Sequence, residues 1–450
     1  MDTTTTDLDF DVLVIGAGAG GATGAALAAH RGYRTLLVEA KERVGGRAST
    51  REVDGFLLNT GALAIEIGGP VDQVRTLIGR PLELYVPKPA TVLLWGHRVF
   101  NAETGLNGWA RRSAPELLAM AARIPRFEPA PGQSLTEWLN LFTHNKAIHN
   151  LADNIAGAFF AAAGSDLPAE VFLAYLSKGS AFKKIGFAPS GTIEVWKPCA
   201  DYVAQRGGQV WLSSTVESLT VSQDGTVNGA VVRRDDRDGE QITVSAAAVI
   251  SDIGPLATAQ LAPSGALPAG YLDDVRAKTD PSAIITIHFA SDKPLTRWSG
   301  LALAASSRRL TYAANYSDPA QRRAPEGWYL YSGAATPRPA RGEFDLEYEI
   351  ELLKADLRDY FPGFDDSKIL AVDVTAHDWP AQRAITGYDL PIDTPIHNLW
   401  NVGDGVKRYP EAGTSACAVT AQLAVEKLTA YYPSRSRRQR VGTGEVADTW

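Results

Sequence analysis

Apolar runs and glycine-rich turns alternate at the start of the chain, and their order predicts a β-α-β unit. Within residues 11–15, Asp11 is followed by an unbroken β-branched and aliphatic run, which is typical of a parallel strand buried on both faces. The alanine-rich stretch after the glycines predicts a helix that ends at Gly32. Residues 35–38 then predict a second buried strand.

The middle of the chain changes from strand to helix periodicity. Residues 82–86 and 91–95 run or alternate apolar, and a turn at Gly96 leads into residues 98–100, so we expect an antiparallel sheet to begin here. Apolar residues at helical spacing then predict a helical cap over a substrate cavity, near residues 107–182. Its expected helices are residues 114–122, 135–142, 148–163 and 169–178.

Strand patterns return after the cap and predict that both structural units are completed late in the chain. The expected elements are a helix at 194–205, strands at 209–212, 214–219, 247–252, 284–289 and 328–331, a helix at 344–357, a strand at 369–375, a short strand within 398–405 and a helix at 415–428. Strands that alternate with helices indicate a parallel sheet, whereas the later strands indicate an antiparallel one.

Composition and charge exclude several classes of protein. The chain has 450 residues and a net charge of −7, so nothing in its charge suggests a nucleic acid partner. No apolar run is long enough to span a bilayer, and residues 1–9 do not form a secretory signal. Two distant cysteines, Cys199 and Cys417, suit a cytoplasmic location, and no Cys/His spacing indicates a metal site. The sequence does not indicate an oligomeric state.

The glycines after the first strand carry the clearest chemistry. Gly16 allows the tight turn, Gly18 lets the backbone approach a pyrophosphate, and Gly21 lets the helix pack close to the sheet. The free N–H groups of the new helix then point at the phosphates. Glu39, at the end of the second strand, can accept hydrogen bonds from ribose hydroxyls. This pattern predicts a dinucleotide with a free 2′-hydroxyl, which is FAD or NAD.

A second glycine loop decides between these two cofactors. Arg43, Gly45, Gly46 and Arg47 extend the phosphate-facing surface in a way that an NAD domain does not need. With residues 43–50, the chain resembles the FAD-dependent amine oxidase and phytoene desaturase superfamily. The resemblance implies FAD as the cofactor and a flavin-dependent enzyme.

The end of the chain repeats the arrangement of a strand, an acidic residue and a helix start. A short strand delivers Gly403 and Asp404, and a helix without large side chains begins near Gly413. The resemblance implies that Asp404 binds the ribityl chain or lies near the phosphates. It also implies that the amides of Thr414 and Ser415, with the helix dipole, stabilise negative charge at N1/O2 of a reduced flavin.

The same resemblance gives the complete set of expected cofactor residues. Asn59 stands where family members often have Asp, and Val216 can hydrogen-bond to adenine through its backbone or be an ordinary strand residue. The expected residues are Gly16, Gly18, Ala19, Gly20, Gly21, Glu39, Ala40, Arg43, Gly45, Gly46, Arg47, Asn59, Gly61, Ala62, Val216, Gly403, Asp404, Glu411, Gly413, Thr414 and Ser415.

The expected fold class is α/β, with a Rossmann-like FAD-binding domain and a second, antiparallel-sheet substrate domain that carries the helical cap. The FAD-binding domain is predicted to be discontinuous. It is assigned residues 10–62, 187–254 and 392–430, and the substrate domain is assigned residues 63–186 and 255–391. Residues 1–9 and 434–450 are expected to be flexible tails.

Candidate catalytic residues are few. Tyr409 matches the place of an aromatic wall beside the flavin ring in amine oxidases, or is an ordinary loop tyrosine. His377 could face the cavity or form a structural pair with Asp378. Neither His288 nor Lys293 can be assigned to the lysine role that amine oxidases usually carry, which favours the desaturase-like branch.

The sequence therefore predicts a FAD-dependent dehydrogenase or desaturase that moves hydride from a C–C or C–N bond of a small molecule to flavin N5. An apolar or aromatic substrate is expected because aromatic residues abound in the segments that we expect to line the cavity. These are Trp95, Phe159, Phe160, Phe172, Trp328 and Tyr329. The alternatives are an isomerase or cyclase without net redox, an amine oxidase, a non-catalytic protein that binds a prenylated partner, and an NAD dehydrogenase.

Overall fold

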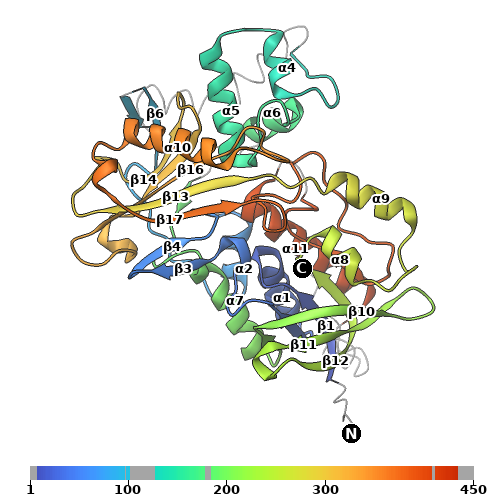
Figure 1. Cartoon of the computed structure of the whole chain (residues 1–450). Helices are drawn as coiled ribbons and strands as arrows, with labels where there is room; N and C mark the ends of the chain where they lie inside the picture. The colour runs from blue at the N-terminus through green and yellow to red at the C-terminus, as the bar shows by residue number, and fades with distance from the viewer. Residues whose placement is uncertain (1–7, 97, 102–126, 178–183, 408–410, 434–450) are drawn as a thin grey trace.

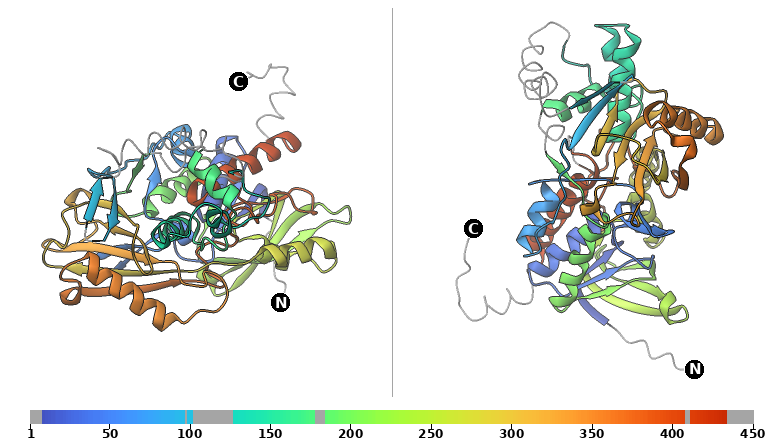
Figure 2. Two further views of the ribbon diagram at one scale, coloured as in Figure 1. Left: turned by 90° about the horizontal axis from the view of Figure 1, so that it is seen from above. Right: turned by 90° about the vertical axis from the view of Figure 1, so that its left-hand side faces the viewer.

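Two seven-stranded sheets organise the protein, as the computed structural model shows (Figure 1). The structure describes residues 8–96, 98–101, 127–177, 184–407 and 411–433. The first sheet lies on one side of the second sheet, and three cap helices lie on the other side (Figures 1 and 2). The prediction of a mixed α/β fold with a Rossmann-like half is confirmed.

The first sheet has a parallel core extended by an antiparallel meander. Its order is β10-β11-β12-β1-β2-β9, and β18 pairs with β12. The strands are β1 (Leu8–Ile15), β2 (Thr35–Val38), β9 (Gln209–Trp211), β10 (Ser214–Val221), β11 (Val227–Arg234), β12 (Glu240–Ser251) and β18 (Leu399–Asn401). Because β1, β2, β9, β12 and β18 are parallel, their carboxyl ends meet at one edge.

Helices cover this sheet because their apolar faces need partners. The helices are α1 (Ala19–His30), α2 (Pro70–Leu77), α7 (Ile193–Gln205), α8 (Pro255–Leu261), α9 (Ala269–Lys278) and α11 (Gly413–Tyr431). α1 packs between α7 and α11, and its row of small side chains lets it lie close to the sheet. α8 packs against β10, and Val275 of α9 is buried in the same core as α1.

The second sheet forms a wall of the cavity described below. Its order is β17-β13-β16-β15-β14-β6-β7. The strands are β6 (Thr91–Trp95), β7 (Arg98–Asn101), β13 (Ile284–Ser291), β14 (Gly300–Ala304), β15 (Leu310–Asn315), β16 (Tyr329–Ala335) and β17 (Lys368–Thr375). Helix α10 (Leu346–Tyr360) buries Leu353 and Leu357 against one face (Figure 1).

Short elements connect the sheets and the cap. β3 (Thr50–Val53) and β4 (Phe56–Asn59) form a hairpin, and β5 (Ile65–Glu66) pairs with β8 (Ile185–Gly186). The cap consists of α4 (Leu135–Asn140), α5 (Lys146–Phe160) and α6 (Ala169–Ser177), which share a separate core. Helices α4 and α6 lie within ranges that the sequence predicts for helices, and α5 begins two residues before its predicted range of 148–163.

Several predictions of individual elements are wrong. Residues 82–86 form no strand, because Tyr85 makes only an isolated bridge to Phe187. The second sheet is not wholly antiparallel, since β6 pairs with β14 in parallel. β1 begins at Leu8, inside the predicted tail. The expected helix at 114–122 lies outside the described residues, and the division of the chain into two domains stays a prediction.

Candidate functional site

A cavity of about 700 Å³ lies where the two sheets and the cap meet. Its volume is within the range of roughly 300 to 1,000 Å³ that is typical of small-molecule and cofactor sites. The carboxyl edge of the first sheet forms one end, and strands of the second sheet with helices α5 and α6 form the other. Ligands of open α/β sheets bind at this edge, so the cavity is the candidate functional site.

Most of the predicted cofactor residues line this cavity. They are Gly16, Gly18, Ala19, Glu39, Ala40, Gly45, Gly46, Arg47, Asn59, Gly61, Ala62, Val216, Asp404, Gly413, Thr414 and Ser415. The predicted residues that do not line it are Gly20, Gly21, Arg43, Gly403 and Glu411. Tyr409 lies outside the described residues, so its position beside a flavin ring stays a prediction.

In the turn between β1 and α1, the backbone of Gly21 packs directly against the backbone of Gly16. Gly16 has a positive φ of +85°, and a Cβ built on Gly21 would lie only 1.8 Å from the carbonyl oxygen of Gly16. No larger residue fits at position 21, because real Cβ atoms do not approach other atoms so closely. The N-cap of α1, Gly18, has no side chain to bond the first helical amides. This turn therefore places the start of α1 directly at the cavity.

Glu39 is held in place by backbone donors at the end of β2. The N–H of Ala17 donates to its Oε2 at 2.7 Å, and the N–H of Lys41 donates to its Oε1 at 2.9 Å. The buried side chain thereby points at the β1–α1 turn. A carboxylate fixed at this position can accept hydrogen bonds from a ribose.

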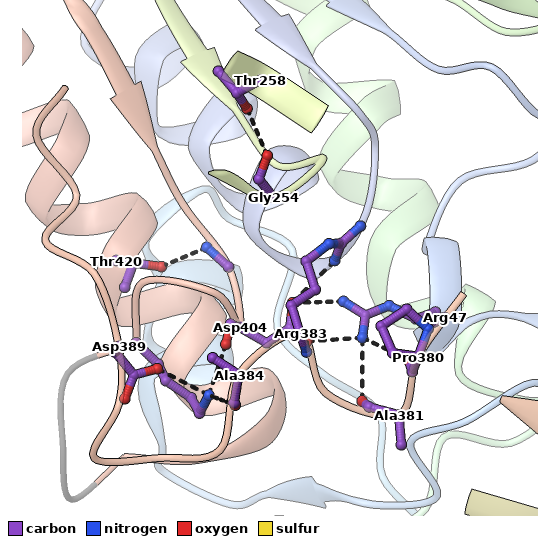
Figure 3. Close-up of polar contacts among 12 residues, drawn as sticks. Arg47, Gly254, Thr258, Pro380, Ala381, Arg383, Ala384, Asp389, Asp404 and Thr420 are labelled. Carbon is purple, nitrogen blue, oxygen red and sulfur yellow. Dashed lines mark hydrogen bonds and ion pairs between the residues drawn. The ribbon is translucent and has the colours of Figure 1, made fainter. Parts of the chain in front are cut away.

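Asp404 is clasped by two arginines (Figure 3). Arg47 donates Nη1 to Oδ2 at 2.8 Å and Nη2 to Oδ1 at 2.5 Å. Arg383 donates its backbone N–H to Oδ2 at 2.9 Å and Nη1 to Oδ1 at 3.0 Å. Burial by itself would raise the pKa of Asp404, but the two guanidinium groups outweigh it and hold the pKa well below its usual range. The carboxylate is therefore ionised across the physiological range.

The cluster of Arg47, Arg383 and Asp404, called the clasp below, connects the two halves of the molecule. Arg47 also donates to the carbonyl oxygens of Pro380 at 2.8 Å and Ala381 at 3.1 Å (Figure 3). These carbonyls precede Arg383 in the segment after β17, whereas Asp404 follows β18 of the first sheet. The three charged side chains thus fix the loop of one sheet to the edge of the other at the cavity wall.

The charged cavity residues that sequence reasoning missed include Arg383 and Asp252. Asp252 follows β12 directly, so the rule that binding residues lie at the carboxyl ends of parallel strands would have found it. Arg383 belongs to no local motif. It reaches the site only because the segment after β17 folds back onto the edge of the first sheet.

Glu66 brings a carboxylate to the start of α11. Its Oε2 accepts a hydrogen bond from Ser415 Oγ at 2.9 Å, and both residues line the cavity. Tyr175 of the cap lines the same region, and burial followed by the charges of Glu66 and Glu411 raises the pKa of its hydroxyl. Tyr175 therefore keeps its proton at neutral pH.

The structure does not support a catalytic role for His377. Its side chain is exposed, and it does not line the cavity. Its backbone adopts a positive φ of +50° at the turn between Ala376 and Trp379, which directs the chain away after β17. The prediction failed because the turn, and not the strand that precedes it, sets the direction of this side chain.

The predicted aromatic lining is mostly wrong. Among the six residues named above, Phe159 alone lines the cavity. Trp95 and Trp328 are exposed, whereas Phe160 and Phe172 are buried in the core of the cap. Among the described residues, the other aromatic side chains that line the cavity are Tyr175, Tyr312 and Trp379. The wall between them is apolar, with Ile155, Ile185, Ile284, Leu301 and Leu303.

Asp373 is the acidic residue of the second sheet that faces this wall. It forms an ion pair with Arg51 of β3, and its Oδ2 lies 3.4 Å from Nε2 of buried His288. Burial by itself would raise the pKa of Asp373, but the charges and hydrogen bonds of His288 and Arg51 lower it. Arg51 and His288 therefore stabilise the negative charge of Asp373.

Other kinds of site find no support in the described part of the chain. There, no group of three or more His, Cys, Asp and Glu side chains is arranged to hold a metal ion. None of the described helices has the length and hydropathy that a bilayer-spanning helix needs. Cys199 and Cys417 are both buried and free.

The parallel sheet, its glycine turn and the cavity at its carboxyl edge define a dinucleotide-binding α/β protein with a second, substrate-facing sheet. The chain belongs to the family of flavin-containing amine oxidoreductases, whose family model matches residues 20–403. This confirms the resemblance found in the sequence and gives the chain a flavin as its class of cofactor.

Individual relatives match over different lengths. Nicotine dehydrogenase from Pseudomonas putida is 51% identical over 47 residues, which cover 10% of this chain and 10% of that protein. A zeta-carotene-forming phytoene desaturase from Myxococcus xanthus is 32% identical over 75 residues, covering 17% of this chain and 14% of that protein. The chain thus matches only a small part of these curated relatives.

The similarity in three dimensions covers nearly the whole chain. The crystal structure of an oxidoreductase from Methanosarcina mazei superposes with a TM-score of 0.80 at 25% sequence identity. The match covers 92% of this chain and 100% of that one. The whole fold, including the second sheet, is therefore shared with an oxidoreductase.

Proposed function

We propose that this protein is a FAD-dependent oxidoreductase that removes hydride from a small, mainly apolar organic molecule. The observation that carries this proposal is the composition of the single cavity described above. Its first-sheet end has the glycine turn, Glu39 and the Arg47–Asp404 pair, which suit an extended dinucleotide. Its far end is lined by aliphatic and aromatic side chains, which suit an apolar substrate.

The residues present fit FAD in chemistry and in space. A Cβ on Gly46 would lie 3.3 Å from Cα of Gly18, so the two glycine loops face each other with room only for backbone. Glu39 would hold the adenosine ribose, and Val216 would lie beside the adenine. The start of α1 and the Arg47 guanidinium would hold the pyrophosphate. The start of α11, with Thr414 and Ser415, would lie at the flavin end.

When bound, FAD would accept the hydride that the substrate loses. The chain's share is to orient the substrate and to exclude water. The apolar wall from Ile284 to Leu303 would position the substrate, and the cap residues Phe159 and Tyr175 would close the cavity against solvent. Among the described lining residues, Glu66 is the carboxylate that the start of α11 places at the proposed flavin end. Tyr409 remains our candidate for an aromatic wall there.

The visible absorption spectrum of the purified protein tests the cofactor. We expect the spectrum of an oxidised flavin, and we expect heat to release FAD rather than FMN, because Glu39 suits an adenosine ribose. Chromatography of the released compound identifies it. A colourless protein that does not take up added FAD would refute the proposal and revive partner binding as a function.

Anaerobic mixing with candidate substrates tests the reaction. The probes are nicotine, after the relative from Pseudomonas putida, and a hydrocarbon polyene, after the relative from Myxococcus xanthus. Bleaching of the flavin by one of them, with an oxidised product of two hydrogens less, supports hydride removal. A product of unchanged mass, formed without an electron acceptor, would instead identify an isomerase or cyclase.

A further inference from the structure

The glycines at the carboxyl edge of the first sheet make room for an acidic side chain. A Cβ on Gly18 would lie 2.4 Å from Oδ2 of Asp252, and a Cβ on Gly20 or Gly403 would lie 2.5 Å from Oδ1. Real Cβ atoms do not come so close to other atoms, so all three positions need glycine while this carboxyl stays in place. The acid therefore links the turn before α1 to the turn after β18.

Charged and polar groups surround Asp252 from several elements. The N–H of Gly21, in the first turn of α1, and the Arg383 guanidinium favour its ionised form, and Arg47 adds to this. Asp404 opposes it. Both arginines, however, already form ion pairs with Asp404. The other titratable group that faces this region is the thiol of Cys417 on α11, and burial raises the pKa of that thiol.

Taken together, these influences raise the pKa of the Asp252 carboxyl. Burial is the largest influence and raises the pKa of its carboxyl to about 7, against the lowering effects of Gly21 and Arg383. At neutral pH the protonated and ionised forms are therefore both populated. Asp404, which lines the same cavity, stays ionised because its own two arginines lower its pKa.

A pyrophosphate bound at the start of α1 would lie in the part of the cavity that Asp252 lines. Asp252 lines the cavity together with Gly18, and the FAD pyrophosphate carries two negative charges. An ionised carboxylate beside it would repel these charges, whereas a protonated carboxyl can donate a hydrogen bond to a phosphate oxygen.

We propose that Asp252 belongs to the cofactor site as a neutral acid, so that FAD binds to the form of the protein in which this carboxyl carries its proton. The inference rests on the proposed flavin site, to which it assigns one further residue, Asp252, in its protonated form. Binding then takes up a proton whenever Asp252 is ionised in the free protein.

The sign of the pH dependence follows from this linkage. Below the pKa of the free protein the carboxyl is already neutral, and the affinity for FAD does not change with pH. Above it, the affinity falls by up to about tenfold for each pH unit, until the pH reaches the higher pKa of the complex.

The test measures FAD binding to the full chain after its flavin has been removed. Flavin fluorescence titrations between pH 6 and pH 9, at constant ionic strength, give the Kd. We expect the wild-type Kd to rise at least about tenfold from pH 7 to pH 9 and the Kd of Asp252→Asn to stay level. Asp373→Asn is the matched control, because it removes a cavity carboxylate that is ionised throughout, and it should keep the wild-type slope.

Proton uptake provides a second measurement that needs no variant. Calorimetry at pH 8, in buffers of different ionisation enthalpy, should show uptake approaching one proton for each FAD bound. Binding without proton uptake, or an Asp252→Asn variant that keeps the wild-type slope, would overturn the inference and leave the proposed function intact. Failure of the wild-type protein to bind FAD at any pH would overturn both.

Discussion

Gly18→Val is expected to yield a protein without flavin. The new Cβ would lie 2.4 Å from Oδ2 of Asp252, so either the carboxyl or the turn before α1 has to move. Even if only the carboxyl moves, the valine side chain occupies the space through which a pyrophosphate would approach the first amides of α1. We expect the affinity for FAD to fall by about 100-fold or more, which corresponds to about 2.7 kcal/mol. Flavin content after purification and fluorescence titration with added FAD measure the loss.

Gly24→Ala is the matched control for this substitution. Gly24 lies within α1, the helix that Gly18 caps, but its added Cβ would meet Ala421 and Ile250 at 3.7 Å, which is ordinary van der Waals contact. Alanine also favours the helical conformation over glycine by roughly 1 kcal/mol. This variant should therefore keep its flavin and melt at or above the wild-type temperature. Full occupancy in Gly18→Val would show that the turn does not form the cofactor site.

Asp404→Ala is expected to have the largest effect on stability. The substitution leaves the guanidinium groups of Arg47 and Arg383 without their shared carboxylate in a mostly buried position. Breaking a buried ion pair by removing one partner costs about 3 to 5 kcal/mol, because an uncompensated charge remains. Urea unfolding of the flavin-free protein should show this as a lower midpoint with little change in slope.

An exposed ion pair provides the comparison. Lys427 Nζ lies 3.0 Å from Oδ1 of Asp393, and the side chain of Asp393 is 54% exposed. Removal of such a pair changes stability by about 0 to 1 kcal/mol. Asp393→Ala should therefore unfold close to the wild-type midpoint. Equal midpoints for Asp404→Ala and Asp393→Ala would mean that the clasp contributes nothing to holding the two sheets together.

The parts of the site that the sequence predicts well are local in the chain. The β1–α1 turn and Glu39 can be located because strand, glycines, helix and acid follow one another within a single β-α-β unit. The start of α11 follows from the same logic at the other end of the chain. Elements with strong periodicity, such as α5 and α10, are also predicted close to their observed positions.

The parts that the sequence does not predict depend on tertiary contacts. Arg383 joins the site through hydrogen bonds to Asp404, and no spacing rule connects a loop after β17 with the end of β18. Aromatic residues mislead for a related reason. Composition cannot show that Trp95 and Trp328 face solvent, since exposure is decided by which strands lie beside them.

The parallel pairing of β6 with β14 also affects how the protein is made. Leu301 pairs with Thr91, so the two strands are separated by roughly 200 residues of chain, and contacts of this kind slow folding. At a synthesis rate of about 5 to 20 residues per second, the β6–β7 hairpin waits on the order of 10 to 40 seconds for its partner strand. Throughout that interval the apolar edge of β6 is available to other chains. An unpaired strand edge can pair with another chain, so we expect chaperones present during synthesis to raise the yield of folded protein.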